Sequence, residues 1–373
     1  MRKNSDKRAV IANIVGARPN FIKIAPIIRE MAKHASLKSM LIHTGQHHDF
    51  TLSELFFREL SISKPDVSLG VGSSTHAVQT GNIMKGLEKC FMTTRPDLVL
   101  VVGDVNSTLA ASLTCSKMGI PVAHIEAGLR SNDLLMPEEI NRIITDRLSK
   151  YLFTTSEDAH LNLKNEGIDK KNVFFVGNVM IDTLKHLLPE AKKIKSVLPQ
   201  YGVKKNNYAL LTLHRPSNVD NKETFMRIIK ALTEISKYLP IVFPIHPRTE
   251  KQINLFKFNH YFDSPNIKLV KPIGYLDNMN LMLNSKFVLT DSGGIQEETT
   301  VLKIPCLTLR ENTERPITAE VGTNTVVGTN TEKILVEFDK IMSDKYKKGK
   351  IPKFWDGRSS ERIVKILERK LNG

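Results

Sequence analysis

The stretch DLVLVVGDVNSTLAASLTCSKMGIPVAHIEAG (97–128) decides the fold class of this 373-residue chain. Its first part, DLVLVVGD, is apolar enough to be buried on both faces, as strands of a parallel sheet are. The run STLAASLTCSKMG (107–119) then predicts a helix that ends at a glycine, and PVAHIEAG (121–128) predicts a second strand. A strand, a helix and a strand in this order indicate two parallel strands joined by a crossover helix.

The same alternation continues on both sides of this stretch. Towards the N-terminus, strands are predicted at 10–15 and 39–45, with a helix over 21–33 between them. Towards the C-terminus, the first half ends with a helix at 137–150 and strands at 151–156 and 173–178. The second half repeats the pattern, with strands at 208–214, 241–247, 267–274, 286–291 and 304–309 and helices at 223–239 and 294–303. We therefore predict an α/β fold of two Rossmann-like, doubly wound domains.

The distribution of charge suggests where the domains meet. The chain has 54 Lys+Arg against 39 Asp+Glu, a formal net charge of +15. Residues 9–184 and 207–343 are close to neutral, so nearly all the excess lies in 1–8, 185–206 and 344–373. We expect an N-terminal domain over 1–184, a basic linker over 185–206 and a second domain over 207–350. The total charge favours a polyanion-binding protein as an alternative, whereas the near-neutral domains favour a solvated linker and tail.

Composition also limits the class of protein and its location. Three cysteines without a Cys-x-x-Cys pair do not make a disulfide framework or a thiolate metal site. The basic start is followed by only a short apolar run, and no stretch is long enough to span a membrane. We expect a cytoplasmic protein that binds neither a membrane nor nucleic acid. No Gly-x-Gly-x-x-Gly or Walker loop is present, so neither a nicotinamide cofactor nor ATP is indicated.

Polar residues gather where the predicted strands end, which is where ligands of doubly wound sheets bind. Both halves of the chain show this concentration. The strand-end segments are Gly16-Ala17-Arg18-Pro19, Thr44-Gly45-Gln46-His47-His48, Gly103-Asp104, Glu126-Ala127-Gly128, His214-Arg215, His246-Pro247 and Asp291-Ser292-Gly293-Gly294.

In the first half, the candidate residues are two cations and three carboxylates. Arg18 and Lys23 put positive charge at a helix start, which indicates a bound phosphate, a charge partner for a catalytic carboxylate, or an ordinary surface helix. Asp104 ends the most apolar strand and is either a functional carboxylate or the N-cap of the next helix. Glu126 ends the neighbouring strand, and Glu138 opens a helix where acidic residues are common. Carboxylates that meet at one sheet edge could act as general acid and base.

In the second half, the residues after the predicted strand at 286–291 are consistent with a diphosphate site. A Ser292-Gly293-Gly294 turn at a helix start exposes backbone N–H groups. Glu298 lies about one turn into that helix, where it could accept hydrogen bonds from a ribose. Arg310 and Arg315 follow the next strand and could reach the phosphates or the uracil side. His214 ends a strand and is either structural or catalytic. The histidines show no metal-binding spacing, and no metal is expected.

Together these segments resemble the non-hydrolysing UDP-N-acetylglucosamine 2-epimerases. The motifs occur in family order over nearly the whole chain and are specific only in combination. They are GARPNFIKIAP (16–26), TGQHHDF (44–50), VGDVNSTLAAS (102–112), HIEAGLRSND (124–133), MPEEINRIITD (136–146), VGNVMIDTL (176–184), TLHRPSN (212–218), TDSGGIQEET (290–299) and ENTERPIT (311–318).

This resemblance implies a GT-B fold, with two Rossmann-like domains facing a cleft and a C-terminal helix, 351–373, that crosses back to the first domain. It implies a homodimer that interconverts UDP-GlcNAc and UDP-ManNAc without a metal or cofactor. In the family, UDP is eliminated to give 2-acetamidoglucal and is then added back with the opposite configuration at C2. The product supplies ManNAc units for a surface polysaccharide.

The family's roles fall on matching residues of this chain. The resemblance makes Asp104, Glu126 and Glu138 the acid/base carboxylates and places His214 beside the diphosphate. It makes Arg18 and Lys23 the basic pair and puts Gln46 and His47 near the sugar. The expected substrate-binding set is completed by Arg215, Ser292, Gly293, Gly294, Glu298 and Arg315.

Departures from the family pattern leave some alternatives open. The segment that binds an activating UDP-GlcNAc in several members has no match in LGVGSSTHAVQTG (69–81). A relative that acts on a 2,3-diacetamido uronic acid derivative would have a similar sequence. A GT-B glycosyltransferase would share the UDP site but would not require the three carboxylates together with His214. The Gly-Ala-Arg-Pro motif (16–19) favours the non-hydrolysing over the hydrolysing epimerase.

Overall fold

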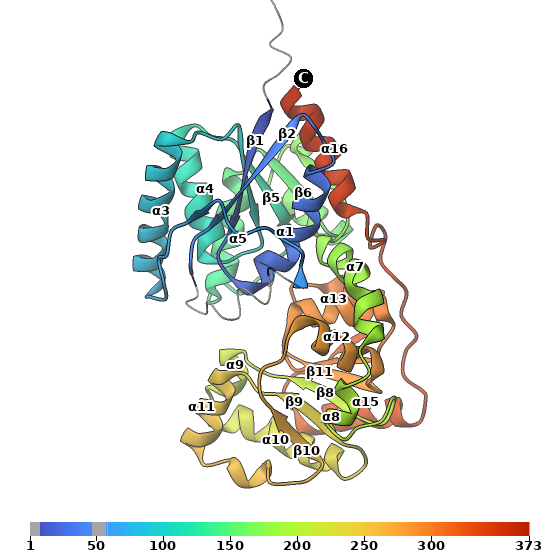
Figure 1. Cartoon of the computed structure of the whole chain (residues 1–373). Helices are drawn as coiled ribbons and strands as arrows, with labels where there is room; N and C mark the ends of the chain where they lie inside the picture. The colour runs from blue at the N-terminus through green and yellow to red at the C-terminus, as the bar shows by residue number, and fades with distance from the viewer. Residues whose placement is uncertain (1–7, 47–56, 58, 373) are drawn as a thin grey trace, which may run out of the picture. The chain divides into compact units, whose positions relative to one another are not determined.

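The computed structural model describes residues 8–46, 57 and 59–372 of the chain. The chain divides into two compact units, Met1–Thr183 with Lys353–Gly373, and Leu184–Pro352. Each unit contains one parallel β-sheet flanked by helices (Figure 1). The predicted doubly wound α/β fold is therefore confirmed. Among the described helices, none combines the length and the apolar character needed to span a membrane.

The sheet of the first unit has seven strands in the order β3-β2-β1-β4-β5-β6-β7, all parallel. Its strands are β1 (Ala9–Val15), β2 (Leu37–His43), β3 (Val67–Ser68), β4 (Leu98–Val102), β5 (Val122–Ala127), β6 (Tyr151–Thr154) and β7 (Val173–Phe175). All five residues of β4 are buried, as its apolar sequence predicts.

Helices cover both faces of this sheet. One layer contains α3 (His76–Thr93), α4 (Asn106–Met118) and α5 (Pro137–Leu148), and the opposite layer contains α1 (Arg18–Met31) and α16 (Ser359–Asn372) (Figure 1). The short helix α6 (Glu157–Asn165) and a 3₁₀ turn (Lys170–Asn172) connect β6 to β7. The pattern of strands and helices did not single out α3, because Gly81 and Gly86 interrupt its apolar residues. Gly86 packs closely on the residue after β3, since a Cβ there would lie 3.1 Å from Cδ1 of Leu69.

The second unit repeats the topology with six parallel strands in the order β10-β9-β8-β11-β12-β13. They are β8 (Ala209–Thr212), β9 (Ile241–Pro244), β10 (Ile267–Val270), β11 (Phe287–Thr290), β12 (Cys306–Thr308) and β13 (Asn324–Val326). The helices are α8 (Val197–Gln200), α9 (Pro216–Val219), α10 (Lys222–Ser236), α11 (Pro247–Phe256), α12 (Tyr275–Asn284), α13 (Gly293–Leu302), α14 (Pro316–Glu320) and α15 (Thr331–Met342), with a 3₁₀ turn at Asn259–Tyr261.

The strand order predicts where each unit binds a ligand. In both sheets the order reverses between two adjacent strands, β1 and β4 in the first unit and β8 and β11 in the second. Ligands of doubly wound sheets bind beyond the carboxyl ends of the strands at this switch point. The segments found there are Gly16–Arg18 and Gly103-Asp104 in one unit, and His214-Arg215 and Asp291–Gly294 in the other.

Helix α7 (Val179–Lys193) contains the boundary between the two units, at Thr183 and Leu184. Residues 185–206, the expected basic linker, form the second part of α7, the short α8 and turns around them. Asn280 of α12 donates to the carbonyl oxygens of Ala191 (2.8 Å) and Ile194 (3.0 Å). The end of α7 is therefore fixed within the second unit.

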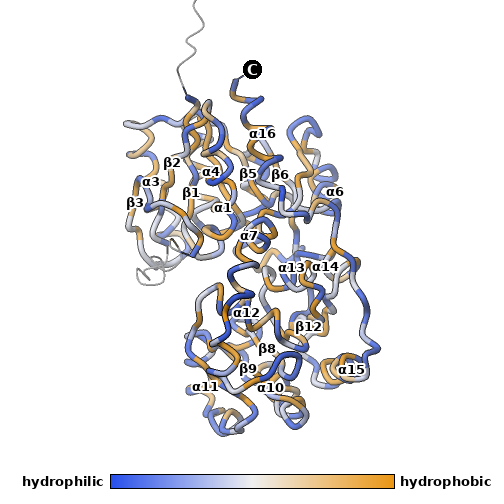
Figure 2. The backbone as a smooth tube through the Cα atoms, turned by 45° about the vertical axis from the view of Figure 1, so that its right-hand side comes forward, coloured by the Kyte–Doolittle hydropathy of each residue, from blue (hydrophilic) through white to orange (hydrophobic). Residues whose placement is uncertain are grey.

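The C-terminal segment belongs to the first unit. Trp355 is 1% exposed, and its Nε1 donates to the carbonyl oxygen of Thr155 at 2.9 Å. Beyond it, α16 packs on α1 through a buried face of Ile363, Val364 and Leu367. In Figure 2, hydrophobic and hydrophilic colours alternate along α16, as expected for a helix with one buried face.

A close backbone contact requires glycine where this segment passes β7. Gly177 has φ +90°, and a Cβ at this position would overlap the carbonyl oxygen of Phe354. Only glycine satisfies both conditions without strain. The glycine of the VGN motif (176–178) therefore has a packing role.

Asp182 of α7 closes the N-terminus of α16. Its Oδ1 accepts from the backbone N–H of Ser359 (3.1 Å), and its Oδ2 accepts from the N–H and hydroxyl of Ser360 (both 2.7 Å). These bonds satisfy N–H groups that have no partner within the helix. Burial raises the pKa of the Asp182 carboxyl above its usual value of 3.8, although the serine hydrogen bonds lower it.

We expect Asp182→Asn to lower the free energy of unfolding by about 1–3 kcal/mol, because an amide nitrogen cannot accept these bonds. The folded carboxyl, with its raised pKa, binds a proton more tightly than the unfolded one. The advantage of the wild type over Asp182→Asn is therefore largest below the usual pKa and shrinks as pH rises through the raised pKa. Urea unfolding of both proteins across this range is the test, and an advantage that grows with pH would contradict it.

Candidate active site

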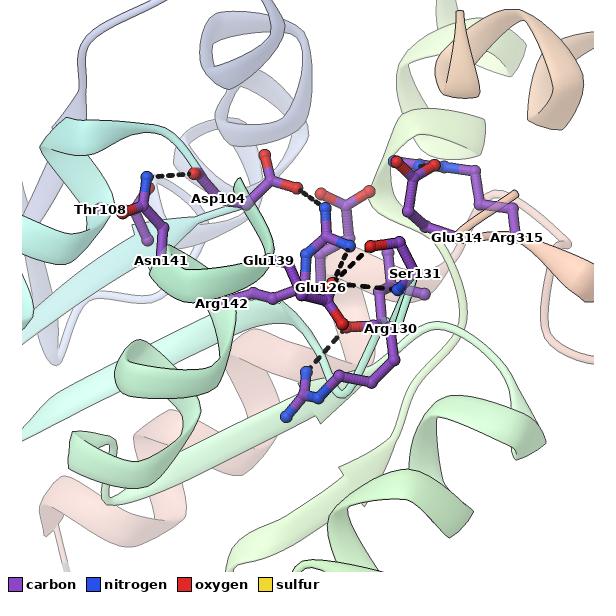
Figure 3. Close-up of polar contacts among 12 residues, drawn as sticks. Asp104, Thr108, Glu126, Arg130, Ser131, Glu139, Asn141, Arg142, Glu314 and Arg315 are labelled. Atoms are coloured by element: carbon purple, nitrogen blue, oxygen red, sulfur yellow. Dashed lines mark hydrogen bonds and ion pairs between the residues drawn. The ribbon is translucent and has the colours of Figure 1, made fainter. Parts of the chain in front are cut away.

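The turn after β4 holds Asp104 in a defined position. Gly103 has φ +68°, and α4 begins at Asn106 with Val105 as its N-cap. The interpretation of Asp104 as a helix cap is therefore wrong. Its carboxylate instead pairs with the guanidinium of Arg142 on α5, and its backbone oxygen accepts from Nδ2 of Asn141 at 2.8 Å (Figure 3).

Arg142 links Asp104 to a fully buried carboxylate. Its Nη1 lies 2.8 Å from Oε2 of Glu139, which is 1% exposed. Glu139 also accepts from the backbone N–H and hydroxyl of Ser131, both at 2.9 Å (Figure 3). It accepts a further bond from the N–H of Asn132 at 2.9 Å. This network fixes the guanidinium that holds Asp104. The neighbouring Glu138 is half-buried in the first turn of α5.

Glu126 has an unusual backbone conformation for a strand residue. Its φ is +73°, and the register of β5 against β6 shifts between Ile125 and Ala127. Such a bulge redirects a side chain, and a left-handed non-glycine residue costs on the order of 1–3 kcal/mol. The carboxylate, 4% exposed, forms an ion pair with the ammonium of Lys23 on α1. Strain of this kind is concentrated at functional sites.

Gly103 lies between these groups. A Cβ on Gly103 would be 3.2 Å from Nζ of Lys23 and 3.4 Å from Oε2 of Glu126. The turn that carries Asp104 therefore packs directly against the Lys23–Glu126 pair. The structure thus brings together two of the predicted carboxylates and one of the predicted cations at the carboxyl edge of the first sheet.

Gln46 also lies at this edge. Its Oε1 accepts from the backbone N–H of Ser107 (3.1 Å) and from the Ser107 hydroxyl (2.7 Å), so it is tied to the start of α4. A Cβ on Gly16 would overlap this hydroxyl, which explains the glycine after β1. Arg18 is the first residue of α1, and its side chain lies outside the described part of the structure. His47 lies outside the described residues.

In the second unit, Asp291 organises the turn after β8. This carboxylate is fully buried, and its Oδ2 accepts from the backbone N–H groups of His214 (2.8 Å) and Arg215 (2.7 Å). Its Oδ1 lies 3.1 Å from Nδ1 of His214. This contact orients the imidazole ring of His214 beside the turn. The ring is half-buried, with its side chain 35% exposed.

The Ser292-Gly293-Gly294 turn starts α13 beside an arginine. Ser292 is the N-cap, and Gly293 and Gly294 are the first two helical residues. A Cβ on Gly293 would overlap the guanidinium of Arg315, whose Nε donates to Oε1 of Glu297 at 2.9 Å. The guanidinium thus lies against the helix start, where N–H groups and the helix dipole favour an anion.

Glu298 lies on the same helix and is 1% exposed. The hydroxyl of Tyr275, at the start of α12, donates to its Oε1 at 2.6 Å. This contact orients the carboxylate that the sequence assigns to the ribose. Arg310 pairs with both oxygens of Glu314 (2.8 and 3.0 Å), so it supports the loop that carries Arg315.

Residues that hold the predicted site residues were not predicted from the sequence. They include Glu139, Arg142, Asp291 as a partner of His214, and Tyr275. Arg142 carries one signal, since it follows Glu138 by four residues on a helix and so lies on the same face. Among the described residues, no three or more His, Cys, Asp or Glu side chains are arranged to hold a metal ion.

The chain is similar to known proteins over nearly its whole length. A family model described as UDP-N-acetylglucosamine 2-epimerase matches residues 29–368. The UDP-N-acetylglucosamine 2-epimerase of Methanocaldococcus jannaschii is 46% identical over 359 residues, covering 95% of this chain and 97% of that protein. A crystal structure of UDP-GlcNAc 2-epimerase from the same organism, in complex with UDP-GlcNAc and UDP, has a TM-score of 0.90 and 45% identity, and covers 96% of this chain and 99% of that chain. The UDP-2,3-diacetamido-2,3-dideoxy-D-glucuronate 2-epimerase of Pseudomonas aeruginosa is 38% identical, covering 96% of this chain and 99% of that protein.

Proposed function

Because the chain belongs to the UDP-N-acetylglucosamine 2-epimerase family, we propose that it interconverts UDP-GlcNAc and UDP-ManNAc by eliminating and re-adding UDP. The observation that carries the proposal is the arrangement of Asp104, Lys23 and Glu126 around Gly103. A carboxylate held by strained backbone beside a lysine is suited to proton transfer at a sugar carbon.

The first unit supplies the acid and base. One carboxylate takes the C2 proton while the electron pair of the C1–O bond leaves with UDP, which gives 2-acetamidoglucal. UDP then bonds to C1 again while a carboxylate delivers a proton to the opposite face of C2. Asp104, Glu126 and Glu138 carry these proton transfers, and Lys23 and Arg18 add positive charge. Gln46, and by resemblance His47, contact the sugar.

The second unit binds UDP and stabilises the leaving group. Elimination places negative charge on the departing diphosphate, and fixed donors aimed at that charge lower the barrier. The N–H groups of the Ser292-Gly293-Gly294 turn and the Arg315 guanidinium supply such donors, and the imidazole of His214 lies beside them in the proposed site. Arg215, held at its N–H by Asp291, lies on the same turn as His214. The Glu298 carboxylate accepts hydrogen bonds from the ribose hydroxyls.

UDP-GlcNAc in D2O, followed by proton NMR, tests this function. We expect deuterium to enter at C2 as UDP-ManNAc appears, because the C2 proton is lost to a group that exchanges with solvent. Release of free ManNAc would instead indicate the hydrolysing reaction. Absence of exchange, with transfer only when an acceptor is present, would indicate a glycosyltransferase.

We expect Glu298→Gln to weaken UDP binding about 10-fold in calorimetry, because a charged acceptor of the ribose diol is lost. Tyr275→Phe is the matched control. It removes the hydroxyl 2.6 Å from Oε1 of Glu298 and leaves the carboxylate in place, so a smaller loss is expected. Unchanged UDP affinity in Glu298→Gln would show that this residue does not bind the ribose.

The 38% identity to the Pseudomonas aeruginosa enzyme favours a second candidate, the same reaction on a modified UDP-sugar. Parallel NMR assays with UDP-GlcNAc and the 2,3-diacetamido uronic acid derivative compare the two substrates directly. We further propose a cytoplasmic homodimer whose product supplies ManNAc units for a surface polysaccharide. Light scattering of the purified protein measures the oligomeric state.

A further inference from the structure

A buried histidine beneath the Asp104 turn has no role in the mechanism above. His124 lies on β5 and is 0% exposed. Its Nε2 is 2.9 Å from the carbonyl oxygen of Gly103, and its Nδ1 is 2.6 Å from Oδ1 of Asp146 on α5. The carbonyl oxygen of Gly103 can accept a hydrogen bond but cannot donate one, and the same holds for an ionised Asp146 carboxylate. Each ring nitrogen of His124 therefore faces a hydrogen-bond acceptor.

The two contacts depend on which ring nitrogens of His124 carry a proton. A neutral imidazole has one N–H, so it makes one of these bonds and leaves the other nitrogen against an oxygen lone pair. An imidazolium makes both bonds, and the Asp146 carboxylate balances its charge. The ring is thus held by Asp146 at Nδ1, and its Nε2 contacts the carbonyl oxygen of Gly103.

Asp146 is itself held from the other side. Its Oδ2 accepts from the backbone N–H of Gly128 (3.0 Å) and lies 2.8 Å from Nη1 of Arg130. Arg130 in turn forms two 2.7 Å bonds to the carboxylate of Glu166. A chain of charged groups therefore runs from Glu166 to the Gly103 carbonyl, and its members support one another.

The Gly103 carbonyl belongs to the peptide that joins Gly103 to Asp104, so its direction fixes the plane from which Asp104 extends. The turn is held at two further points, by the N–H of Gly103 on the carbonyl oxygen of Ile125 (3.2 Å) and by Asn141 on the carbonyl oxygen of Asp104 (2.8 Å). Arg142 holds the carboxylate. Within the described residues, His124 is the only residue found in hydrogen-bond contact with the carbonyl oxygen of Gly103.

We propose that His124, held at Nδ1 by Asp146, is a positioning residue that sets the direction of the Asp104 carboxylate. The inference rests on the proposed function, because the Asp104 proton transfer is what it supports. A shift of about 1 Å in a reacting group costs on the order of 100-fold in rate. Loss of the Nε2 donor therefore lowers kcat with little effect on UDP affinity.

Two substitutions at position 124 separate the two hydrogen bonds. The amide of Gln extends as far as Nε2 and can still donate to Gly103, whereas the shorter Asn reaches only the Nδ1 position and can still contact Asp146. We expect His124→Asn to lower kcat about 100-fold or more, with the Kd for UDP within about twofold of the wild type. His124→Gln is expected to stay within about 10-fold of the wild-type kcat. A reversed order, or equal losses that follow the two unfolding free energies, would assign His124 a purely structural role.

A double-mutant cycle shows whether His124 acts through Asp104. In an Asp104→Asn background, we expect His124→Asn to lower C2 exchange by no more than about 3-fold, because the group it positions is already absent. A full further 100-fold loss would overturn the proposal. If His124→Asn does not fold, a folded His124→Gln with a loss above 100-fold would overturn it as well. A wild type without C2 exchange would contradict the proposed function itself, and an active wild type with a fully active His124→Asn would contradict only this inference.

Discussion

Glu126→Gln is expected to lower kcat by about 10³-fold while UDP still binds. The amide keeps the size of the side chain but can neither take nor give the C2 proton, and general acid–base groups contribute about 10²–10⁴-fold. C2 exchange in D2O measures the chemical step, and calorimetry with UDP measures binding. Asp104→Asn is expected to behave in the same way.

Glu30→Gln is the matched control for Glu126→Gln. Glu30 also pairs with a lysine of the α1 region, since its Oε2 lies 2.6 Å from Nζ of Lys33, whose side chain is 68% exposed. This surface pair is worth little, and its loss should leave activity within about twofold. Near-normal turnover in Glu126→Gln, or an equal loss in Glu30→Gln, would remove Glu126 from the catalytic step.

Among the substitutions proposed, Gly177→Ala is expected to lower the free energy of unfolding most. It is also expected to detach the C-terminal segment around Phe354 and Trp355 from the rest of the first unit. Its Cβ overlaps the Phe354 carbonyl oxygen, so one of two backbone segments has to move. Moving it breaks the adjoining contacts of Trp355, and removing a buried Trp from its site costs about 3–5 kcal/mol. Trp355 is the single tryptophan of the chain, so its fluorescence reports this release directly. We expect a red-shifted emission and a much lower unfolding midpoint.

Gly167→Ala separates steric overlap from backbone strain. Gly167 also has a positive φ, +76°, but nothing lies within 4 Å of the position of its Cβ. Both variants therefore carry the strain of a left-handed alanine, about 1 kcal/mol, and only Gly177→Ala carries the overlap. Equal destabilisation of the two variants, with unchanged tryptophan emission, would show that the Phe354 contact does not matter.

The sequence was sufficient to predict the sheets because their strands are short, apolar and separated by polar turns. DLVLVVGD predicts β4 because buried parallel strands tolerate no polar residue between Leu98 and Val102. The strand ends then locate Asp104, Glu126 and His214, since a parallel sheet brings its carboxyl ends to one edge. Helix α3 was not predicted because two glycines obscure the i, i+4 spacing of Ile83, Leu87 and Phe91.

The contacts that hold the site depend on distances that a sequence pattern does not encode. Lys23 and Glu126 are far apart in sequence, and so are Arg142 and Asp104. The residue with left-handed backbone in the β5 bulge is Glu126 and not a glycine, so the sequence does not mark the bulge. Surrounding packing maintains this strained backbone. His124 is indistinguishable by pattern from an ordinary strand residue, and only the positions of Asp146 and Gly103 show its hydrogen bonds.

The first unit is assembled from two separate parts of the chain, and this sets an order of events during synthesis. Residues Lys353–Gly373 leave the ribosome only after Leu184–Pro352 has been made, which takes roughly 10–30 s at about 5–20 residues per second. During that interval the surface of α1 that packs against Ile363, Val364 and Leu367 is uncovered. The Asp182 carboxylate also lacks the hydrogen bonds that it accepts from Ser359 and Ser360 in the complete chain. The second unit, contiguous in sequence, has its whole complement of strands and helices before the first unit does. The nascent chain therefore exposes an apolar face of its first unit to chaperones and to aggregation until the last helix emerges.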